Sequence, residues 1–443
     1  MRRTANVVRF IMAVAVSAFS AHAAPAAEKP TAYRRFAVTD ENGKVVKLEV
    51  VPSVSTPLWA RDVRQNPSAW AGRDAGQPFF DRPIDFVRPP AEGSGEVFYP
   101  HNHCPALTWC TNGDLLACWF STDDEKSTKM TILASRLRAG ANEWDTASEF
   151  FKADDANMTG SALFHDGKGM LCHFNSMGRK GVRGWGELAL LLRTSTDNGA
   201  TWTPPRTISS GATYQNRHQV IAGTLMTRDG TLIQACDATP GGEGPTALHL
   251  SRDHGLTWTE AGGEIRGIHA GVVELKDGRL MAFARGQVID GQMPMSVSSD
   301  LGKTWSNKAT VFPPVGGTQR LVLMRLREGP LLLVSFAKQM MFTDQNGKEF
   351  AGTGLYAALS FDEGVNWPTR RLVTPGAGSF KGMSKGSFTA APDRAEPRGY
   401  LAATQTPDGV IHLISSALYY RFNLAWLKQP VPPLQAGQAG DGR

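Results

Sequence analysis

One short string recurs along this chain and constrains its fold more than any other feature. Residues 195–202 read Ser-x-Asp-x-Gly-x-Thr-Trp, and a worn version occupies residues 135–144. The complete copies begin at Ser195, Ser251, Ser298 and Ser360. Starts that lie roughly 50 to 60 residues apart indicate one supersecondary unit repeated along the chain.

The string itself predicts a tight turn. Asp197 can accept hydrogen bonds from backbone N–H groups of its own turn, and Gly199 can supply an unusual backbone angle. Trp202 is expected to pack between neighbouring units. These strings are therefore interpreted as structural, and no catalytic role is assigned to them.

A second pattern alternates with the first. Each copy has an apolar run, a glycine-containing turn and another apolar run, which is a β-hairpin signal because glycine accepts positive φ. The six turn glycines are Gly113, Gly167, Gly230, Gly278, Gly329 and Gly409.

Four strands per unit and six units predict an all-β fold, a six-bladed β-propeller over residues 101–430. A β-helix or a β-sandwich would repeat at shorter intervals. Residues 24–100 are expected to contribute to ring closure and to form a wrapped loop. The apolar stretches at 44–51 and 422–427 are expected to share one sheet that closes the ring, and residues 431–443 are expected to be disordered.

The first 23 residues are typical of an export signal, with Arg2, Arg3 and Arg9 before a short apolar run and a small-x-small site at residues 21–23. Localisation is therefore expected to be periplasmic or secreted. No later segment has the length and apolarity of a membrane span. The formal net charge of +6 falls to about +3 without the signal, and no Lys/Arg run suggests nucleic acid. A monomer is expected.

Five cysteines leave at least one unpaired, and most lie in apolar runs where cysteine is a small buried hydrophobe. His101 and His103 alternate on a strand, but no histidine–carboxylate pattern indicates a metal site. We predict neither a metal nor a cofactor.

The Ser-x-Asp string is similar to the Asp-box, or bacterial neuraminidase (BNR) repeat. With six blades, the chain resembles the sialidase superfamily over roughly residues 95–430. The resemblance implies exo-α-sialidase chemistry on glycans. Such enzymes bind the substrate carboxylate with three arginines, and a glutamate activates a tyrosine nucleophile beside an aspartate acid/base.

Carried over residue by residue, the resemblance places the tyrosine at Tyr400 and one arginine at Arg285. His101 and His103 stand where the family has its first arginine. His269 stands at the glutamate position.

The acid/base location falls in an acidic loop, with Asp123, Asp124 and Glu125 as candidates. A plain solvated loop is the alternative interpretation. Lys338 occupies the region of the third arginine.

Histidines, arginines and a tyrosine also gather at the predicted starts of inner strands. If the register is right, they face one central mouth, where histidine can act as a base and arginine can hold an anionic sugar. A strand-start histidine is otherwise usually structural. The set is His101, His103, Arg217, His218, His269, Arg320 and Tyr400.

Three functional hypotheses remain open. The first is an exported sialidase-like glycoside hydrolase acting on terminal acidic sugars, with Tyr400 as nucleophile or positioning hydroxyl and Asp124 or Glu125 as acid. The second is a lyase acting on uronic-acid glycans, with His103 or His269 as base and Tyr400 as acid. The third is a glycan-binding propeller without catalysis.

Overall fold

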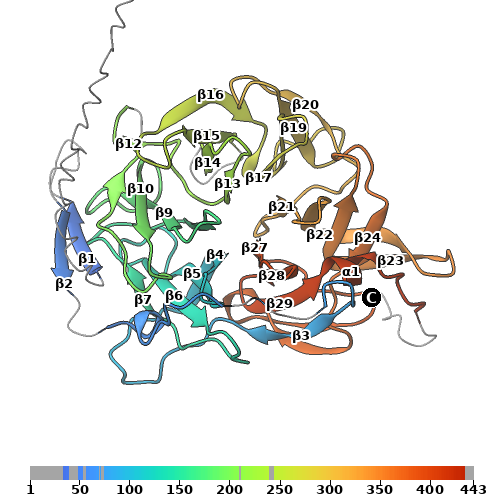
Figure 1. Cartoon of the computed structure of the whole chain (residues 1–443), viewed down its shortest axis with the longest axis horizontal. Helices are drawn as coiled ribbons and strands as arrows, with labels where there is room; N and C mark the ends of the chain where they lie inside the picture. The colour runs from blue at the N-terminus through green and yellow to red at the C-terminus, as the bar shows by residue number, and fades with distance from the viewer. Residues whose placement is uncertain are drawn as a thin grey trace, which may run out of the picture. The chain divides into compact units, whose positions relative to one another are not determined.

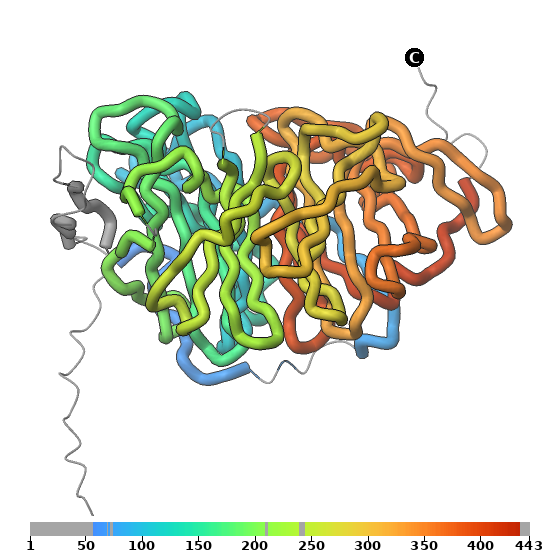
Figure 2. Tube along the Cα trace, turned by 90° about the horizontal axis from the view of Figure 1, so that it is seen from above, coloured from blue at the N-terminus to red at the C-terminus, as the bar shows by residue number. Residues whose placement is uncertain are grey.

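The computed structural model describes residues 33–38, 48–52, 56–68, 70, 74–208, 211–238 and 244–434. The export signal expected at residues 1–23 and the chain after Leu434 lie outside the described residues. Six antiparallel sheets surround one axis (Figure 1). Seen edge-on, the strands run between the two faces of the ring (Figure 2). The prediction of an all-β, six-bladed β-propeller is confirmed.

Each sheet of the first half runs outward in chain order. Sheet one contains β4 (His101–Trp109), β5 (Leu115–Thr122), β6 (Thr131–Leu137) and β7 (Ser148–Phe151). Sheet two contains β8 (Ser161–His165), β9 (Leu171–Gly178), β10 (Leu188–Ser195), β11 (Arg206–Thr207) and β12 (Tyr214–Gln215). Sheet three contains β13 (Thr224–Met226), β14 (Leu232–Asp237), β15 (Thr246–Ser251) and β16 (Thr259–Ile265).

The second half follows the same order until the last strand. Sheet four contains β17 (Ile268–Glu274), β18 (Leu280–Arg285), β19 (Pro294–Ser298) and β20 (Ser306–Ala309). Sheet five contains β21 (Val322–Arg325), β22 (Leu331–Thr343), β23 (Glu349–Ser360) and β24 (Thr369–Leu372). Sheet six contains β27 (Ala402–Gln405), β28 (Val410–Ile414), β29 (Leu418–Asn423) and, from far upstream, β3 (Phe80–Asp85).

The closing strand differs from the prediction. β3 pairs with β29 and completes sheet six, so the two lie side by side although hundreds of residues separate them (Figure 1). Residues 44–51 are not part of this sheet, because β2 (Leu48–Pro52) pairs with β1 (Tyr33–Val38). Downstream of Phe422, strand β29 ends at Asn423, whose side chain caps the short helix α1 (Leu424–Lys428).

The six predicted hairpins all form between the first two strands of a sheet. Their turn glycines have φ values between 80° and 110°, as the turns require.

The Ser-x-Asp turns share one hydrogen-bond pattern. In the first, the Ser195 hydroxyl donates to Asp197 (2.7 Å) and accepts from the Gly199 amide (3.0 Å), while the Thr201 amide donates to Asp197 (2.9 Å). The residue before the glycine also has positive φ, 57° at Asn198, so the turn uses two left-handed residues where the sequence predicted one.

The tryptophans of these turns pack on the preceding sheet, as predicted. The Trp202 ring lies 5.4 Å from that of Phe150 in β7, and Trp258 lies 5.5 Å from Phe174 in β9.

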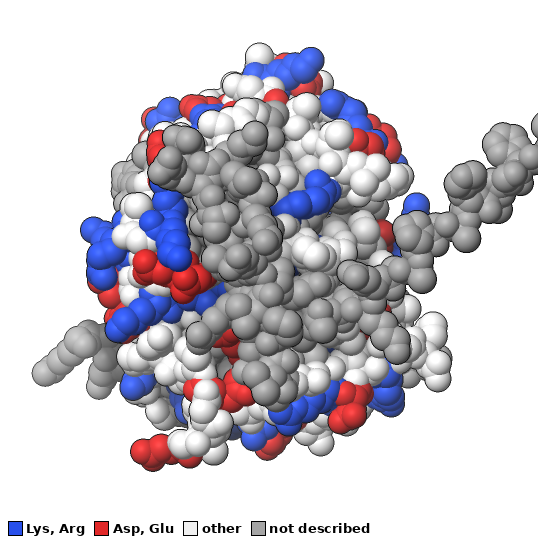
Figure 3. Space-filling view, turned by 90° about the vertical axis from the view of Figure 1, so that its left-hand side faces the viewer, with Lys and Arg blue, Asp and Glu red and all other residues white. Residues whose placement is uncertain are grey.

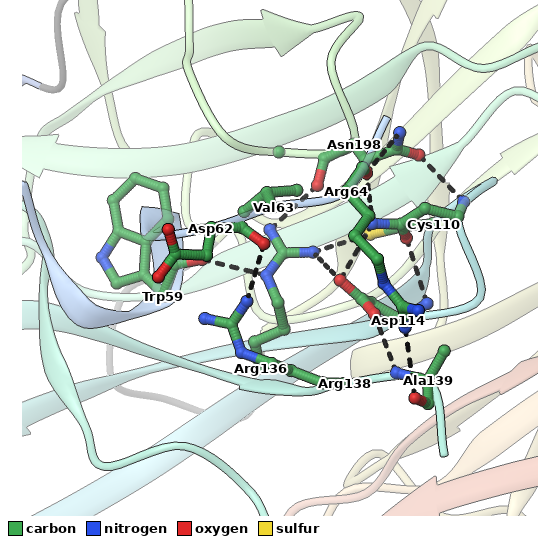
Figure 4. Close-up of polar contacts among 12 residues, drawn as sticks. Trp59, Asp62, Val63, Arg64, Cys110, Asp114, Arg136, Arg138, Ala139 and Asn198 are labelled. Carbon is green, nitrogen blue, oxygen red and sulfur yellow. Dashed lines mark hydrogen bonds and ion pairs between the residues drawn. The ribbon is translucent and has the colours of Figure 1, made fainter. Parts of the chain in front are cut away.

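In the worn copy at residues 135–144 the Ser135 hydroxyl donates to the Asp145 carbonyl (2.6 Å), and the next residue, Arg136, forms a buried ion pair (Figure 4). Arg136 donates to Asp114 (3.0 Å) and to the carbonyls of Trp59 (2.9 Å) and Asn198 (2.8 Å). Asp114 also accepts from the Ala139 amide (2.8 Å). This Arg136 cluster joins sheet one to the upstream segment and to the turn of sheet two.

Smaller elements decorate the ring. The hairpin of β25 (Gly378–Lys381) and β26 (Ser387–Ala390) encloses the 3₁₀ turn η2 (Met383–Lys385), and η1 (Leu58–Ala60) precedes β3. In the part that the structure describes, no helix has both the length and the apolarity needed to cross a bilayer. Where Figure 3 shows described residues, basic and acidic side chains are interspersed.

Candidate active site

One mouth of the propeller axis brings together side chains from four sheets. All inner strands run in the same direction, so their starts share this mouth with the ends of the antiparallel second strands. His103 and His269 lie near the starts of β4 and β17, and Tyr400 precedes β27. Asp237 and Arg285 are the last residues of β14 and β18. These side chains line a cavity of about 160 Å³.

A chain of short hydrogen bonds runs through this pocket. Asp237 Oδ2 lies 2.6 Å from His269 Nδ1, and His269 Nε2 lies 2.8 Å from the Tyr400 hydroxyl. The Asp237 carboxylate also accepts from the backbone amide of His269 (2.7 Å). We name Asp237, His269, Tyr400 and Arg285 the Tyr400 cluster.

The hydrogen bonds fix the tautomer of His269. A carboxylate only accepts, so Nδ1 carries the hydrogen and Nε2 has a free lone pair for the Tyr400 O–H. Burial lowers the pKa of His269 below its usual value, although Asp237 opposes this shift. A neutral His269 is therefore a proton acceptor aimed at Tyr400.

Arg285 supplies positive charge at the same oxygen. Its Nη1 donates to the Tyr400 hydroxyl at 3.0 Å, and the only other described acceptor is the Gln319 carbonyl (3.4 Å). Burial raises the pKa of Tyr400 well above its usual value, while the Arg285 hydrogen bond works in the opposite direction. The resting phenol is thus protonated and needs a base to become a nucleophile.

His103 forms another wall of the pocket. Its ring lies 4.0 Å from the Tyr400 ring, and its Nδ1 lies 3.1 Å from the Ser416 hydroxyl, which also accepts from the Tyr400 amide (3.0 Å). Burial, reinforced by nearby cationic groups, holds the pKa of His103 well below its usual range. His103 thus positions Tyr400 as a neutral ring.

The acidic loop contributes one of its three carboxylates. Glu125 lines the cavity, and its Oε1 lies 2.9 Å from His101 Nε2. His101 Nδ1 in turn contacts the Ser384 hydroxyl (3.1 Å). Asp124 instead pairs with Arg183 (2.5 Å), and Asp123 lies near Lys129 (3.9 Å).

Three residues expected at the mouth lie elsewhere. Arg217 pairs with Glu260 (2.6 Å) in the outer strand of its sheet. His218 is buried and its Nδ1 contacts the Leu188 carbonyl (2.9 Å). Neither lines the pocket, because the chain that precedes β13 turns these side chains towards neighbouring strands.

Arg320 lies beneath the pocket and does not face it. Its buried guanidinium donates to the carbonyls of Pro105, Ile221 and Leu401, which lie in or just before the inner strands of three other sheets. It also lies 5.5 Å from the centre of the Tyr400 ring. Because each guanidinium nitrogen donates to a backbone carbonyl, Arg320 ties these segments together across the axis, and it does not line the pocket.

Sequence reasoning missed Asp237 and Trp185, which both line the pocket. Asp237 is the last residue of the second strand of its sheet, as Arg285 is of its own. Polar residues at the ends of second strands could therefore have been included among the candidates. Trp185 lies on the loop between β9 and β10, and no pattern marked it.

All five cysteines are buried and free. Cys104 lines the pocket, and burial raises the pKa of its thiol. Among the described residues, no group of three His, Cys, Asp or Glu side chains is arranged to hold a metal ion.

The fold and the repeats define a sialidase-like β-propeller. The family model for the BNR repeat-like domain matches residues 113–413, and the chain belongs to this family.

Known proteins agree with this assignment. The chain is 26% identical over 368 residues to a sialidase of Micromonospora viridifaciens, covering 75% of this chain and 53% of that protein. It therefore spans about half the length of this relative. A Hadza microbial sialidase has a similar structure (TM-score 0.53, 19% identity, 73% of this chain and 66% of the other). So has a protein of unknown function from Dyadobacter fermentans (TM-score 0.54, 13% identity, 78% and 99%).

Proposed function

We propose that this protein is an exported, sialidase-like glycoside hydrolase that removes terminal acidic sugars from glycans. One observation carries the proposal: the Tyr400 hydroxyl is held between the acceptor nitrogen of His269 (2.8 Å) and the guanidinium of Arg285 (3.0 Å) at the mouth of a pocket. A tyrosine with an adjacent base and an adjacent cation is equipped for nucleophilic catalysis.

In the first step, the Tyr400 oxygen attacks the anomeric carbon and its proton passes to His269 Nε2. Asp237 stabilises the imidazolium that forms. The glycosidic C–O bond breaks, and the leaving alcohol takes a proton from Glu125, the pocket carboxyl of the acidic loop. Arg285 holds the substrate anion beside the reacting carbon.

In the second step, Glu125 takes a proton from water, whose oxygen displaces Tyr400 from the sugar. His269 returns its proton to the tyrosine oxygen, so the enzyme regains its starting state. Because the pKa of free Tyr400 is raised by burial, proton removal and attack are expected to occur together.

The test is turnover of the purified protein on sialosides, uronides and rhamnosyl-uronides, with reducing-end and ultraviolet readouts. Tyr400→Phe is expected to lower kcat/KM by about 10³-fold. Tyr419→Phe is the matched control, because Tyr419 also contacts a buried histidine, His412 (2.6 Å), but lies outside the pocket.

The alternatives predict different outcomes. Formation of an unsaturated, ultraviolet-absorbing product would show that the protein is a lyase and not a hydrolase. Binding without turnover, with Tyr400→Phe altering affinity only, would make the protein a glycan-binding propeller.

Export rests on the sequence of residues 1–23. When cells that express the protein are fractionated beside a cytoplasmic marker, the processed protein is expected outside the cytoplasmic fraction. Its N-terminus is expected to show cleavage after Ala23. An intact N-terminus in the cytoplasmic fraction would contradict export.

A further inference from the structure

We propose that the opposite mouth of the propeller axis binds an oxyanion, a carboxylate or sulfate group carried by a small polar molecule such as an acidic sugar. This site would bind its ligand whether or not the Tyr400 pocket catalyses hydrolysis.

The site is a cavity of about 510 Å³ formed by the last residues of the six inner strands. It shares no lining residue with the Tyr400 pocket. The Arg320 side chain crosses the axis between the two mouths, closer to the Tyr400 pocket than to this cavity.

Positive charge dominates the wall of this cavity. One carboxylate, Glu274, lines it beside four cationic side chains. A second carboxylate, Glu363, pairs with two of the cations from outside. The four cations are Arg228, Lys276, Arg325 and Arg327.

The cations differ in how far they are already neutralised. Arg325 donates to both oxygens of Glu363 (3.1 and 2.6 Å), and Arg228 approaches Glu274 (3.4 Å). Arg327 has no carboxylate partner among the described residues, and its Nε makes only a long contact to the Gln405 carbonyl (3.4 Å). Its terminal N–H groups are thus available to a bidentate oxyanion.

Lys276 adds a second available charge. Its ammonium group is 3.5 Å from Glu363 and the side chain is 65% exposed, so that ion pair is weak and easily exchanged.

An aromatic wall supports Arg327. Its guanidinium lies 5.8 Å from the centre of the Trp109 ring, and the His165 ring stacks on Trp109 at 3.7 Å. Burial lowers the pKa of His165 to about 4, so the histidine adds no charge at neutral pH. A polar ligand with one anionic group therefore meets fixed cations on one side and uncharged rings on the other.

The volume suits a small ligand. Pockets for small molecules commonly span a few hundred Å³, and this cavity lies in that range. Sodium sulfate and sodium glucuronate are suitable probes, with glucose as the neutral control at equal ionic strength.

The experiment is calorimetric titration in an Arg285→Gln background, which removes the half-buried cation that lines the Tyr400 pocket. Sulfate and glucuronate are expected to bind, and glucose is not. Arg327→Gln is expected to weaken binding at least about tenfold, and Lys276→Gln several-fold. Arg279→Gln is the matched control, because Arg279 is exposed on the nearby β17–β18 turn and pairs with Asp277.

Folding of each variant is checked by its thermal midpoint, and Lys276→Gln alters an exposed side chain that the fold does not need. Binding of sulfate alone would restrict the ligand to a small oxyanion or sulfate ester. Equal affinities in the parent, Arg327→Gln and Lys276→Gln, or no binding to the Arg285→Gln protein, would overturn the proposal. Hydrolytic activity does not enter this test.

Discussion

The Arg136 cluster and the Tyr400 cluster are both buried networks built on an aspartate, yet they differ in completeness. Asp114 accepts from Arg136, Asn112 and the Ala139 amide, and the guanidinium of Arg136 ends on protein acceptors (Figure 4). In the Tyr400 cluster, the described hydrogen-bond partners of the Asp237 carboxylate both belong to His269. The other end of this hydrogen-bond chain, at Tyr400, faces a cavity.

This difference separates stability from chemistry. A buried network in which every group is satisfied holds segments together, because losing one partner leaves an uncompensated buried charge. A network that stops at a pocket keeps donor and acceptor capacity for a ligand. Four predictions test this contrast, from the largest expected effect to the smallest.

Asp237→Asn is expected to lower kcat by about 10³- to 10⁴-fold on whichever substrate the panel identifies, because an amide at this position can stabilise the wrong His269 tautomer and no longer balances the imidazolium. The pH–rate profile is expected to lose the acid-side limb set by protonation of His269, whose pKa lies below its usual value. The urea midpoint should change little.

The matched control is Asp229→Asn, which alters an exposed aspartate on the β13–β14 turn. A large stability loss in Asp237→Asn, with an unchanged pH profile, would assign Asp237 to the fold alone.

Asp114→Asn is expected to destabilise the protein by about 3–5 kcal/mol, because Arg136 is left charged and buried without its carboxylate. Residual folded protein is expected to keep its kcat. Urea unfolding measures the effect, and Asp277→Asn, in an exposed pair with Arg279, should cost less than about 1 kcal/mol. Similar midpoints for both variants would remove the structural role of the Arg136 cluster.

Glu396 sharpens the contrast, because the donors to this buried carboxyl among the described residues are both neutral: Ser415 and Tyr420, each at 2.8 Å. Burial raises the pKa of Glu396 to about 7. The native state therefore retains a proton that the unfolded state releases near pH 4.5, and stability falls as pH rises between these values.

The predicted loss is about 3 kcal/mol from pH 4.5 to 7, from roughly 1.4 kcal/mol per unit. Glu396→Gln is expected to remove this slope, measured by urea midpoints across that range. Parallel curves for the two proteins would show that Glu396 is not the group responsible.

Glu125→Gln is expected to lower kcat about 10²-fold on substrates with a poor leaving group. Asp124→Asn is expected to change kcat by less than about threefold, since Asp124 holds Arg183. On substrates with a good leaving group, the kcat of Glu125→Gln should return towards that of the parent protein. A larger loss of kcat in Asp124→Asn than in Glu125→Gln would indicate that Asp124 is the acid.

The ring and its hairpins were predictable because they are encoded locally. Each turn glycine and each Ser-x-Asp string fixes its own backbone within a few residues. The closing strand was not predictable in this way. β3 reads Phe-Asp-Arg-Pro-Ile-Asp and is largely half-buried, because it pairs on one edge only and carries no alternating apolar pattern.

The site was predictable in part. The starts of the inner strands indicated which residues gather at one mouth, and Tyr400 and Arg285 match positions of the sialidase pattern. What the sequence could not show is the direction of side chains at two irregular strands. The ladder shifts register after His103 and after Ile268, where Cys104 and His269 have φ values of 52° and 56°. The left-handed residues of these bulges are not glycines, so the sequence does not reveal that they turn His103 and His269 into the pocket.

The pairing of β3 with β29 also determines when the ring can close during synthesis of the chain. Strand β3 is synthesised early and waits for its partner until nearly the whole chain has emerged. Tyr400 directly precedes the first strand of that same last sheet. A polypeptide cut short before Tyr400 therefore lacks the strands that close the ring and also the tyrosine of the pocket, so the Tyr400 cluster is complete only once the last sheet has been made.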